Sequence, residues 1–413
     1  MSSTKNDKID IEGLAEEFDT PLFIYESQKI IKNYRKLDSA FSSRYSDFQI
    51  NFAVKSNFNP SIVELLVEEG AGLDCASKAE IKLAKKLNCS EVMYTAPYNR
   101  KDELEYAIEK GAFVNLDSIF LLEKLDEVPD RICFRIDPGI GKGDFGLVFG
   151  GGDTKFGVPE ERAVEAYKKA KEKGVEKFGI HMMTGSNVTE PEYFQEITQK
   201  IMEIAGRIAN ELKIEFEFID IGGGLGIPYK PGEKELDIDK TAELVTESFK
   251  QGIEKYNIGE PELRIEPGRY LVAESGKLIS KVTGVKIKQD KEFIGLDTGM
   301  HHNLRPALLD AYHEIKTPYQ DCETSEKTVV GPVCSSIDVI AEERQLPDKL
   351  KQGDIISIED IGAYGFVMSS HWNSRPLPAE VMIKDGEAQL IRQRQNKEQI
   401  FHGTKLDHEN GKK

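Results

Sequence analysis

Short apolar runs bounded by turn residues recur through the first part of the chain and predict strands. There are eight of them: Gln49–Val54, Gly72–Cys75, Val92–Thr95, Phe113–Leu116, Ile132–Ile136, Phe178–Met182, Phe216–Ile221 and Leu263–Glu266. Segments in which apolar residues repeat with helical spacing separate these runs and predict helices. The helical segments are Ser61–Glu69, Ser77–Lys86, Lys101–Lys110, Glu161–Lys173, Pro191–Leu212 and Thr241–Tyr256. Strand and helix therefore alternate, which is typical of a parallel sheet.

Eight strands with helices between them predict an α/β fold, a closed (β/α)8 barrel of the TIM type. An open, doubly wound sheet with a similar number of strands has the same periodicity and stays an alternative. Between the fifth and sixth strands lies a glycine-rich insertion, Gly139–Gly157, which is too long for a simple loop. This insertion is placed where a lid could sit.

After Arg269 the pattern changes to strands without long helices between them. These strands are Leu278–Lys288, Lys291–Leu296, Thr328–Val330, Asp354–Ile358 and Ala379–Ile383. We expect a C-terminal β-rich domain, to which the early run Pro21–Tyr25 adds a strand because chain termini often lie close together. The predicted division is 28–275 for the barrel, 1–27 with 276–400 for the β-rich domain, and 401–413 for a polar tail.

Composition narrows the classes of function. The chain has 413 residues and a net charge of −17, which gives no electrostatic basis for binding nucleic acid or an anionic membrane. No apolar run approaches the length of a membrane helix, and residues 1–10 lack the apolar core of a signal peptide, so we expect a cytoplasmic protein. The five cysteines form no CxxC pair, and neither disulfides nor a metal site is expected.

Polar residues stand where the predicted strands end, and in a parallel barrel catalytic groups gather at these carboxyl ends. Six strands end in this way, at Lys55, Asp74, Arg135 with Asp137, His181 to Ser186, Gly222–Gly224 and Glu266. Lys55 follows an apolar strand, where loss of water would lower the pKa of its amine and favour nucleophilic attack. Taken alone, such a lysine is more often a side chain that simply reaches solvent.

Two motifs add chemistry to these strand ends. Ile221–Tyr229 is rich in glycine, which lets backbone N–H groups approach an anion closely; it predicts a phosphate cradle, with a tight structural turn as the alternative. Glu266–Arg269 places an acid and a base after the eighth strand. An acid there could keep a pyridine nitrogen protonated, which makes the ring a stronger electron sink. The alternative is an ion pair between Glu266 and Arg269 that closes the barrel.

Six motifs in order resemble the diaminopimelate, ornithine and arginine decarboxylase family of fold type III pyridoxal-phosphate enzymes. They are Asn51–Asn57, Asp74–Ser77, Gly222–Tyr229, Glu266–Arg269, Gly331–Asp338 and Gly362–Val381. The resemblance extends from about Pro21 to Ile383. It is strongest for the diaminopimelate decarboxylase branch, through Leu304–Leu308, Asp310–His313 and Gly362–Pro376.

This resemblance implies a pyridoxal-phosphate-dependent amino-acid decarboxylase in which Lys55 carries the cofactor and Glu266 is the partner of its ring nitrogen. The other implied cofactor contacts are Asp74, His181, Met183, Ser186, Gly223, Gly224, Gly268, Arg269 and Tyr364. The implied substrate contacts are Arg269, Arg305, Ser335 and Tyr364. Cys334 would return a proton to the substrate, reaching in from the other subunit of a homodimer. The alternative for Cys334 is a small buried apolar residue.

Three positions depart from the family pattern. Ser335 stands where the family usually has a glutamate that binds the distal ammonium of the substrate, and Leu309 stands where it usually has a tyrosine. Met183 aligns with the histidine that stacks on the cofactor ring, although His181 lies two residues earlier on the same face of the strand. A thioether can still pack on an aromatic ring, so the cofactor contacts are better preserved than the substrate contacts.

These observations leave several functions open. The first is a decarboxylase of diaminopimelate, which yields lysine, or of a related amino acid without the distal zwitterion. The second is an amino-acid racemase on the same barrel, although Glu266 predicts a strong electron sink that suits decarboxylation better. The third is a cofactor-binding homologue without activity, against which Lys55, Glu266 and Cys334 all argue.

Overall fold

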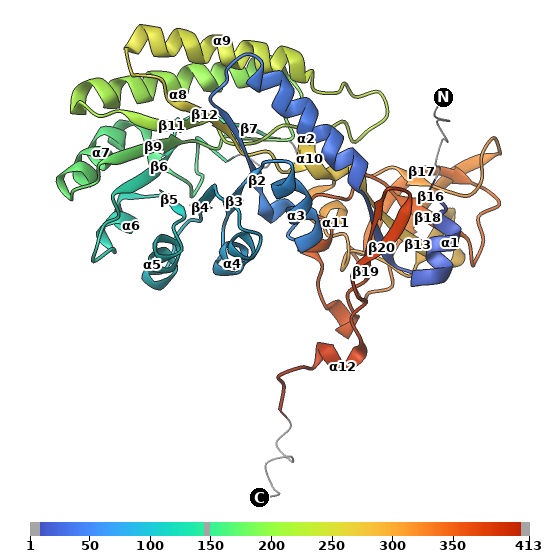
Figure 1. The fold of residues 1–413 in the computed structure, drawn as a ribbon. Coiled ribbons are helices and arrows are strands. Elements are labelled where there is room, and N and C mark those ends of the chain that lie inside the picture. The colour runs from blue at the N-terminus through green and yellow to red at the C-terminus, as the bar shows by residue number, and fades with distance from the viewer. Residues whose placement is uncertain (1–8, 144–148, 406–413) are drawn as a thin grey trace, which may run out of the picture. The chain divides into compact units, whose positions relative to one another are not determined.

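Eight parallel strands close into a barrel, as the alternation of strand and helix predicts. Their order is β5, β4, β3, β2, β12, β11, β9 and β6, and a further pairing of β5 with β6 joins the ends. The bounds are β2 Phe48–Ala53, β3 Gly72–Cys75, β4 Val92–Thr95, β5 Phe113–Leu116, β6 Arg131–Asp137, β9 Lys177–His181, β11 Phe216–Asp220 and β12 Glu262–Ile265. Closure excludes the open, doubly wound sheet. Figure 1 shows the helices outside this ring of strands.

The structure is a computed structural model that describes residues 9–143 and 149–405. The chain divides into two units: residues 28–274, the barrel unit, and residues 1–27 with 275–413, the β-rich unit. The longer helices of the barrel unit are α2 Ser27–Ser42, α3 Pro60–Glu68, α4 Lys78–Lys86, α5 Lys101–Glu109, α7 Ala163–Glu172, α8 Pro191–Leu212 and α9 Ile238–Tyr256. Two short helices complete it, α6 Ile119–Glu123 and α10 Arg269–Val272. No helix among the described residues is long and apolar enough to cross a membrane.

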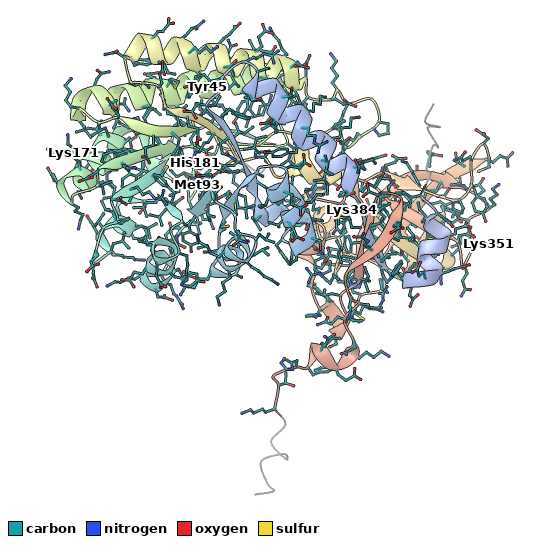
Figure 2. All side chains as sticks on the ribbon, in the orientation of Figure 1. Tyr45, Met93, Lys171, His181, Lys351 and Lys384 are labelled. Atoms are coloured by element: carbon teal, nitrogen blue, oxygen red, sulfur yellow. The ribbon has the colours of Figure 1, made fainter. Side chains whose placement is uncertain are left out.

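Side chains fill the barrel at two levels of different chemistry. One level is an apolar cluster of Met93, Phe113, Cys133 and Phe218. The Phe218 ring fits because Gly179 has no side chain, since a Cβ there would lie 2.1 Å from the ring. The other level is polar and includes His181, which Figure 2 labels in the barrel together with Met93. The barrel is therefore a packed core with polar groups at the carboxyl ends of its strands.

The glycine-rich insertion is held at its base by Asp137, the last residue of β6. One Asp137 oxygen, Oδ1, accepts hydrogen bonds from the N–H groups of Gly139, at 3.0 Å, and Gly151, at 2.6 Å. Two short strands follow β6, β7 Lys142–Gly143 and β8 Val158–Pro159; β7 pairs with β10 Gly185–Ser186, and β8 pairs with β6. Residues 144–148 lie outside the described residues, and the predicted lid remains a prediction.

The β-rich unit is one sheet with the order β17, β16, β14, β13, β1, β19 and β20, while β18 pairs with β13 and with β15. The bounds are β1 Leu22–Glu26, β13 Gly276–Lys288, β14 Lys291–Leu296, β15 Ile315–Lys316, β16 Thr324–Val330, β17 Val339–Pro347, β18 Ile355–Ile358, β19 Ala379–Lys384 and β20 Glu387–Arg392. β1 pairs antiparallel with β13 and parallel with β19, which confirms that the N-terminal run adds a strand to this sheet. The pattern missed β15, β17 and β20.

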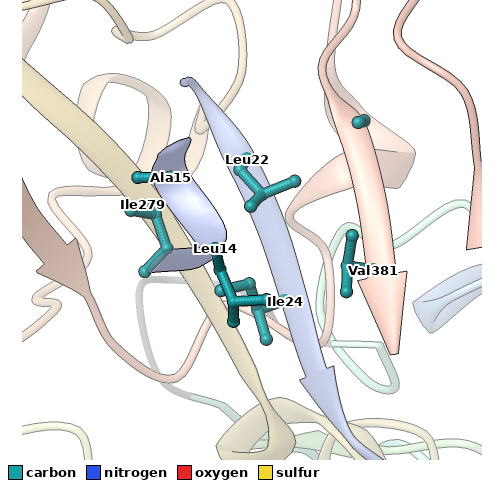
Figure 3. Packing of buried hydrophobic residues seen from close by; sticks show 7 residues of the cluster. Leu14, Ala15, Leu22, Ile24, Ile279 and Val381 are labelled. Carbon is teal, nitrogen blue, oxygen red and sulfur yellow. The ribbon is translucent and has the colours of Figure 1, made fainter. Parts of the chain in front are cut away.

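Successive side chains of β1 point to opposite faces of the sheet. Leu22 and Ile24 pack with Ile279 and Val381 beneath α1, Ile11–Phe18, as Figure 3 shows. On the other face, the Tyr25 hydroxyl donates to Glu380 Oε1 at 2.8 Å. Both faces of β1 are buried, which explains why its sequence is almost continuously apolar. The unit ends with a short helix, α12 Lys397–Ile400, and the predicted tail lies mostly outside the described residues.

Candidate active site

The ends of the barrel strands bring the predicted polar residues together. His181 is the last residue of β9, Asp220 is the last residue of β11, and Glu266 directly follows β12. His181 and Asp220 are neighbours across β9 and β11, and His181 also pairs with Arg135 of β6. Residues far apart in the chain therefore share one edge of the barrel, as its geometry requires.

Lys55 lies in a short 3-10 turn, Val54–Ser56, just after β2, and pairs with Asp74 of β3. Its Nζ is 3.0 Å from Asp74 Oδ2. The Lys55 side chain is 45% exposed and that of Asp74 is 1% exposed, so the expected loss of water around the amine is wrong. Burial and the negative charge of Glu266 raise the pKa of Asp74, despite the opposing charge of Lys55.

His181 and Glu266 form a buried pair inside the barrel. His181 Nε2 is 2.9 Å from Glu266 Oε2, and both side chains are 1% exposed. Burial alone would raise the pKa of Glu266, but the charge and hydrogen bond of His181, aided by Lys55, hold it below its ordinary value. The other Glu266 oxygen, Oε1, is buried without a partner among the described residues. Glu266 thus has one oxygen that can still accept a hydrogen bond.

Asp220 joins this pair and was not predicted as a site residue. The nearest donor atoms of His181, Asp220 and Glu266 lie within 4.8 Å of one another, a spacing that a metal ion could also bridge. Asp220 Oδ1 accepts a hydrogen bond from Gly222 N at 2.8 Å, while Oδ2 is buried without a partner among the described residues. Burial raises the pKa of Asp220 well above its ordinary value, and the charge of Glu266 raises it further.

The glycine loop after β11 packs too closely for side chains. A Cβ on Gly223 would lie 2.2 Å from the Glu266 carbonyl oxygen, and one on Gly224 would lie 2.9 Å from the Gly185 carbonyl oxygen. Gly222 and Gly224 also have positive φ angles of 73° and 99°, which favour glycine. The loop is therefore a tight turn whose glycines are required by close backbone packing, and the phosphate cradle stays a prediction.

Arg269 connects this loop with β10. Its guanidinium donates to the Tyr229 hydroxyl at 2.7 Å and to Ser186 Oγ at 3.3 Å. Arg269 is thus tied to the predicted phosphate cradle, and the carboxylate of Glu266 pairs with His181, so the alternative of a barrel-closing Glu266–Arg269 pair is not observed. Tyr229 is the last residue of the glycine motif, and this position was the signal that could have identified it. Gly268 caps α10 just before Arg269.

Met183 and Arg135 support the same edge of the barrel. Gly223 N donates to the sulfur of Met183 at 3.2 Å, so the thioether lies against the glycine loop. Arg135 is buried and donates to the carbonyl oxygens of Phe149, at 3.1 Å, and Met183, at 3.4 Å. These bonds join β6 to the segment that follows β9.

The other predicted site residues lie in the β-rich unit. Arg305 begins α11, Arg305–Leu309, is 1% exposed and donates to His313 Nε2 at 3.1 Å. His313 Nδ1 lies 2.9 Å from the Glu359 carbonyl oxygen, which can only accept. His313 therefore carries its proton on Nδ1 and presents a lone pair to Arg305. Leu309, at the end of α11, is half-buried.

Cys334 and Ser335 lie on the loop between β16 and β17. Cys334 is exposed, so the alternative of a buried apolar residue is wrong for this chain. Its N–H donates to Asn373 Oδ1 at 2.7 Å. Ser335 is half-buried, and its hydroxyl accepts from Ile337 N at 3.4 Å. Tyr364 is half-buried with a φ of 58°, an unusual conformation for a tyrosine.

The barrel, its polar strand ends and its glycine cradle are features of cofactor-dependent α/β-barrel enzymes. A family model described as the pyridoxal-binding domain of pyridoxal-dependent decarboxylases matches residues 27–273. This chain belongs to the pyridoxal-dependent decarboxylase family.

The alignments with several relatives extend over nearly the whole chain. The diaminopimelate decarboxylase of Methanothermobacter thermautotrophicus is 41% identical over 95% of this chain and 93% of its own length. Protein TabA of Pseudomonas amygdali pv. tabaci is 34% identical over 91% of this chain and 88% of its own length. The crystal structure of diaminopimelate decarboxylase from Helicobacter pylori complexed with L-lysine is 32% identical, with a TM-score of 0.87, and covers 97% of this chain and 100% of its own.

The barrel residues fit pyridoxal phosphate. Lys55 supplies an exposed amine, and Glu266 Oε1 is a buried acceptor without a partner among the described residues, as a ring N–H requires. The glycine loop packs at Gly224 against Gly185, and Arg269 donates to the neighbouring Ser186, so a guanidinium lies near this loop. An amine, a ring-nitrogen acceptor and a phosphate cradle are the three features that this cofactor needs.

Proposed function

We propose that this chain decarboxylates meso-diaminopimelate to lysine and CO2. The buried Glu266–His181 pair, beside the Lys55–Asp74 pair, is the observation that carries the proposal. When bound, pyridoxal phosphate supplies an electron sink for the charge left as CO2 departs. The several relatives named diaminopimelate decarboxylase support the choice of substrate.

The barrel residues have three proposed roles: attachment of the cofactor, contact with its ring nitrogen, and packing beside its ring. Lys55 attaches the cofactor, and Asp74 orients the amine of Lys55 through their hydrogen bond. Glu266 accepts a hydrogen bond from the ring nitrogen, and His181 stabilises the ionised form of Glu266. Met183 packs beside the ring in place of a histidine. A negatively charged Glu266 would favour a protonated ring nitrogen in bound pyridoxal phosphate, an arrangement that suits decarboxylation better than racemisation.

The phosphate contacts are proposed from the cradle. Backbone N–H groups of Gly224 and the Gly268–Arg269 turn would bind phosphate oxygens, together with Ser186 Oγ, while the N–H of Gly223 donates to Met183. The bond from Arg269 to Tyr229 positions the guanidinium for this anion. Tyr364 is a further proposed contact to phosphate or substrate.

The proposed substrate contacts differ in the part of the substrate that they meet. Arg269 and Arg305 bind substrate carboxylate, since a guanidinium forms two parallel hydrogen bonds with it. Ser335 contacts the distal end, and Cys334 returns a proton to the carbon that has lost CO2. We propose a homodimer in which Cys334 serves the site of the partner subunit. The division into two domains and the cytoplasmic location likewise remain predictions.

A second candidate is a decarboxylase for an amino acid without the distal zwitterion. Ser335 favours it because a hydroxyl replaces the acid that the family pattern offers to a distal ammonium. The relative TabA, which is 34% identical, is not named as a decarboxylase. The relatives therefore do not all carry the same name.

One experiment separates the two candidates. Purified protein loaded with pyridoxal phosphate is offered meso-diaminopimelate, L-lysine, L-ornithine and L-arginine, and release of CO2 is measured. We expect kcat/KM to be highest for meso-diaminopimelate. A higher value for any other amino acid would favour the second candidate, and no release from any of them would favour a cofactor-binding protein without activity.

A further inference from the structure

Two neighbouring side chains of the β-rich unit are buried without hydrogen-bond partners among the described residues. His301 and Asn303 are each 1% exposed. Both ring nitrogens of His301 and both amide atoms of Asn303 lack a partner in this part of the chain. Burial of an unpaired polar group is costly, so such groups call for an explanation beyond packing.

The adjacent histidine provides a contrast within one dipeptide. His302 Nδ1 is 3.1 Å from Thr298 Oγ1, and Nε2 is 3.3 Å from the Pro376 carbonyl oxygen. The rings of His301 and His302 lie against each other, with centroids 3.7 Å apart. His302 thus has the full set of bonds expected of a structural histidine, whereas the His301 ring has none to the described residues.

Three segments of the β-rich unit meet around His301: residues 297–305, 331–338 and 369–376, called here the three-segment cluster. Ser370 N donates to the His301 carbonyl oxygen at 2.8 Å, and Met300 N donates to Asp338 Oδ1 at 2.6 Å. Arg375 donates to the carbonyl oxygen of Pro332 at 3.4 Å. His301 therefore belongs to the same cluster as Cys334, Ser335 and Arg305, which carry the proposed substrate contacts.

Few acceptors in this cluster are available to a ligand. The carboxylate of Asp338 already accepts from Met300 N and, at 2.8 Å, from Val333 N. Arginine side chains only donate. Among the described residues of the cluster, the buried acceptors without a partner belong to His301 and Asn303. Burial and the charge of Arg375 lower the pKa of His301 to about 4, so its ring is neutral and keeps a lone pair.

We propose that His301 and Asn303 recognise the distal amino group of the substrate by accepting hydrogen bonds from it, in place of the acid missing at Ser335. This inference rests on the proposed function, because it assigns the distal end of that substrate. The distal carboxylate is left to Arg305. The carboxylate of Asp338 is already occupied by backbone N–H groups, and a neutral imidazole and an amide can accept from an ammonium without adding negative charge.

The test compares two ligands that differ by one amino group. L-lysine carries an amino group and a carboxylate at its distal end, while 6-aminohexanoate carries the carboxylate alone. Calorimetry on the protein loaded with pyridoxal phosphate gives the ratio of their dissociation constants. We expect wild type to prefer L-lysine, and His301→Phe to reduce that preference about tenfold, the effect of one hydrogen bond to a charged group.

His302→Gln is the matched control. It should lower Tm, because the bonds to Thr298 and Pro376 are altered, and leave the ligand preference unchanged. His301→Phe should keep or raise Tm, since it removes an unpaired buried polar group. Asn303→Leu provides a second test should the His301→Phe protein fold poorly.

Two results would overturn the inference: a wild-type protein that binds both ligands equally or neither, and variants at 301 and 303 that keep the wild-type preference. Failure of the proposed function looks different. In that case meso-diaminopimelate releases no CO2 while the preference for L-lysine and its loss in His301→Phe are still measured.

Discussion

The barrel edge and the three-segment cluster handle polar groups in opposite ways. At the barrel edge, ionisable side chains pair with one another: the buried Glu266 with the buried His181, and the buried Asp74 with the exposed Lys55. In the three-segment cluster, the buried acid Asp338 is occupied by backbone N–H groups, and the unpaired groups on His301 and Asn303 are neutral.

This difference corresponds to two tasks, which are the type of reaction and the choice of substrate. The type of reaction depends on charges near the cofactor, and the barrel holds those charges on the rigid ends of strands. The proposed contacts to the distal end of the substrate include loop residues such as Ser335, and loops tolerate substitutions that leave the core undisturbed. Changes at the barrel edge should therefore affect all substrates, and changes in the cluster should affect only some.

The largest effect is expected from Lys55→Ala. Without this amine the protein has no covalent attachment for pyridoxal phosphate, so turnover of every amino acid should be lost. CO2 release and the visible absorbance of lysine-bound cofactor measure this. Lys82→Ala, an exposed helix position, is the control and should behave as wild type. A Lys55→Ala protein that keeps a borohydride-reducible absorbance band would mean that another lysine binds the cofactor.

Glu266→Gln should cut kcat by about two orders of magnitude while the fold and much of the cofactor binding persist. A neutral amide no longer favours a protonated ring nitrogen, so the ring withdraws less electron density. Single-turnover decarboxylation measures the step directly. Glu262→Gln, at the start of the same strand, is the matched control. Near-normal rates in the Glu266→Gln protein would rule out the proposed role.

Ser335→Glu, alone or with Leu309→Tyr, should raise kcat/KM for meso-diaminopimelate about tenfold, or about 1.4 kcal/mol. The added carboxylate would meet the distal ammonium that, in our proposal, the cluster contacts through neutral groups. Steady-state kinetics with L-lysine as a second substrate shows whether the gain is specific. Efficient wild-type turnover that the double change leaves flat would indicate that other residues, such as His301, already suffice.

The smallest effect is expected from Asp220→Asn. Because burial raises the pKa of Asp220 and so favours its neutral form, an amide should change the free energy of unfolding by less than about 1 kcal/mol, while Asp220→Ala, which also loses the bond to Gly222 N, should cost more. Urea unfolding measures both.

The pH dependence gives this prediction a direction. The folded pKa of Asp220 lies above the unfolded value, so the folded state binds the extra proton and stability falls as pH rises from the unfolded pKa through the folded one. Asp220→Asn should remove that part of the decline. Identical pH profiles for wild type and the Asp220→Asn protein would contradict a raised pKa for Asp220 in the folded protein.

Prediction from sequence succeeded where the signal is local. The eight barrel strands were located within one or two residues. A short apolar run bounded by turn residues marks each strand, whichever strands it pairs with. The prediction missed β20, most of whose residues are exposed, and β17, in which the polar run Glu342–Gln345 interrupts the apolar pattern. It also missed Asp220 and Tyr229, although both flank the glycine motif, since neither residue type is unusual at its position.

The sequence by itself determined the order of elements, the glycine loop and the family to which the chain belongs, because these depend on residues that are neighbours in the chain. Only the tertiary structure decided which distant groups meet: His181 with Glu266, Arg269 with Ser186, and Asp338 with the N–H of Met300. It also decided that Lys55 is exposed and that the His301 ring is buried without a partner among the described residues. Burial and pairing depend on how the whole chain closes around each side chain, and no local pattern encodes that closure.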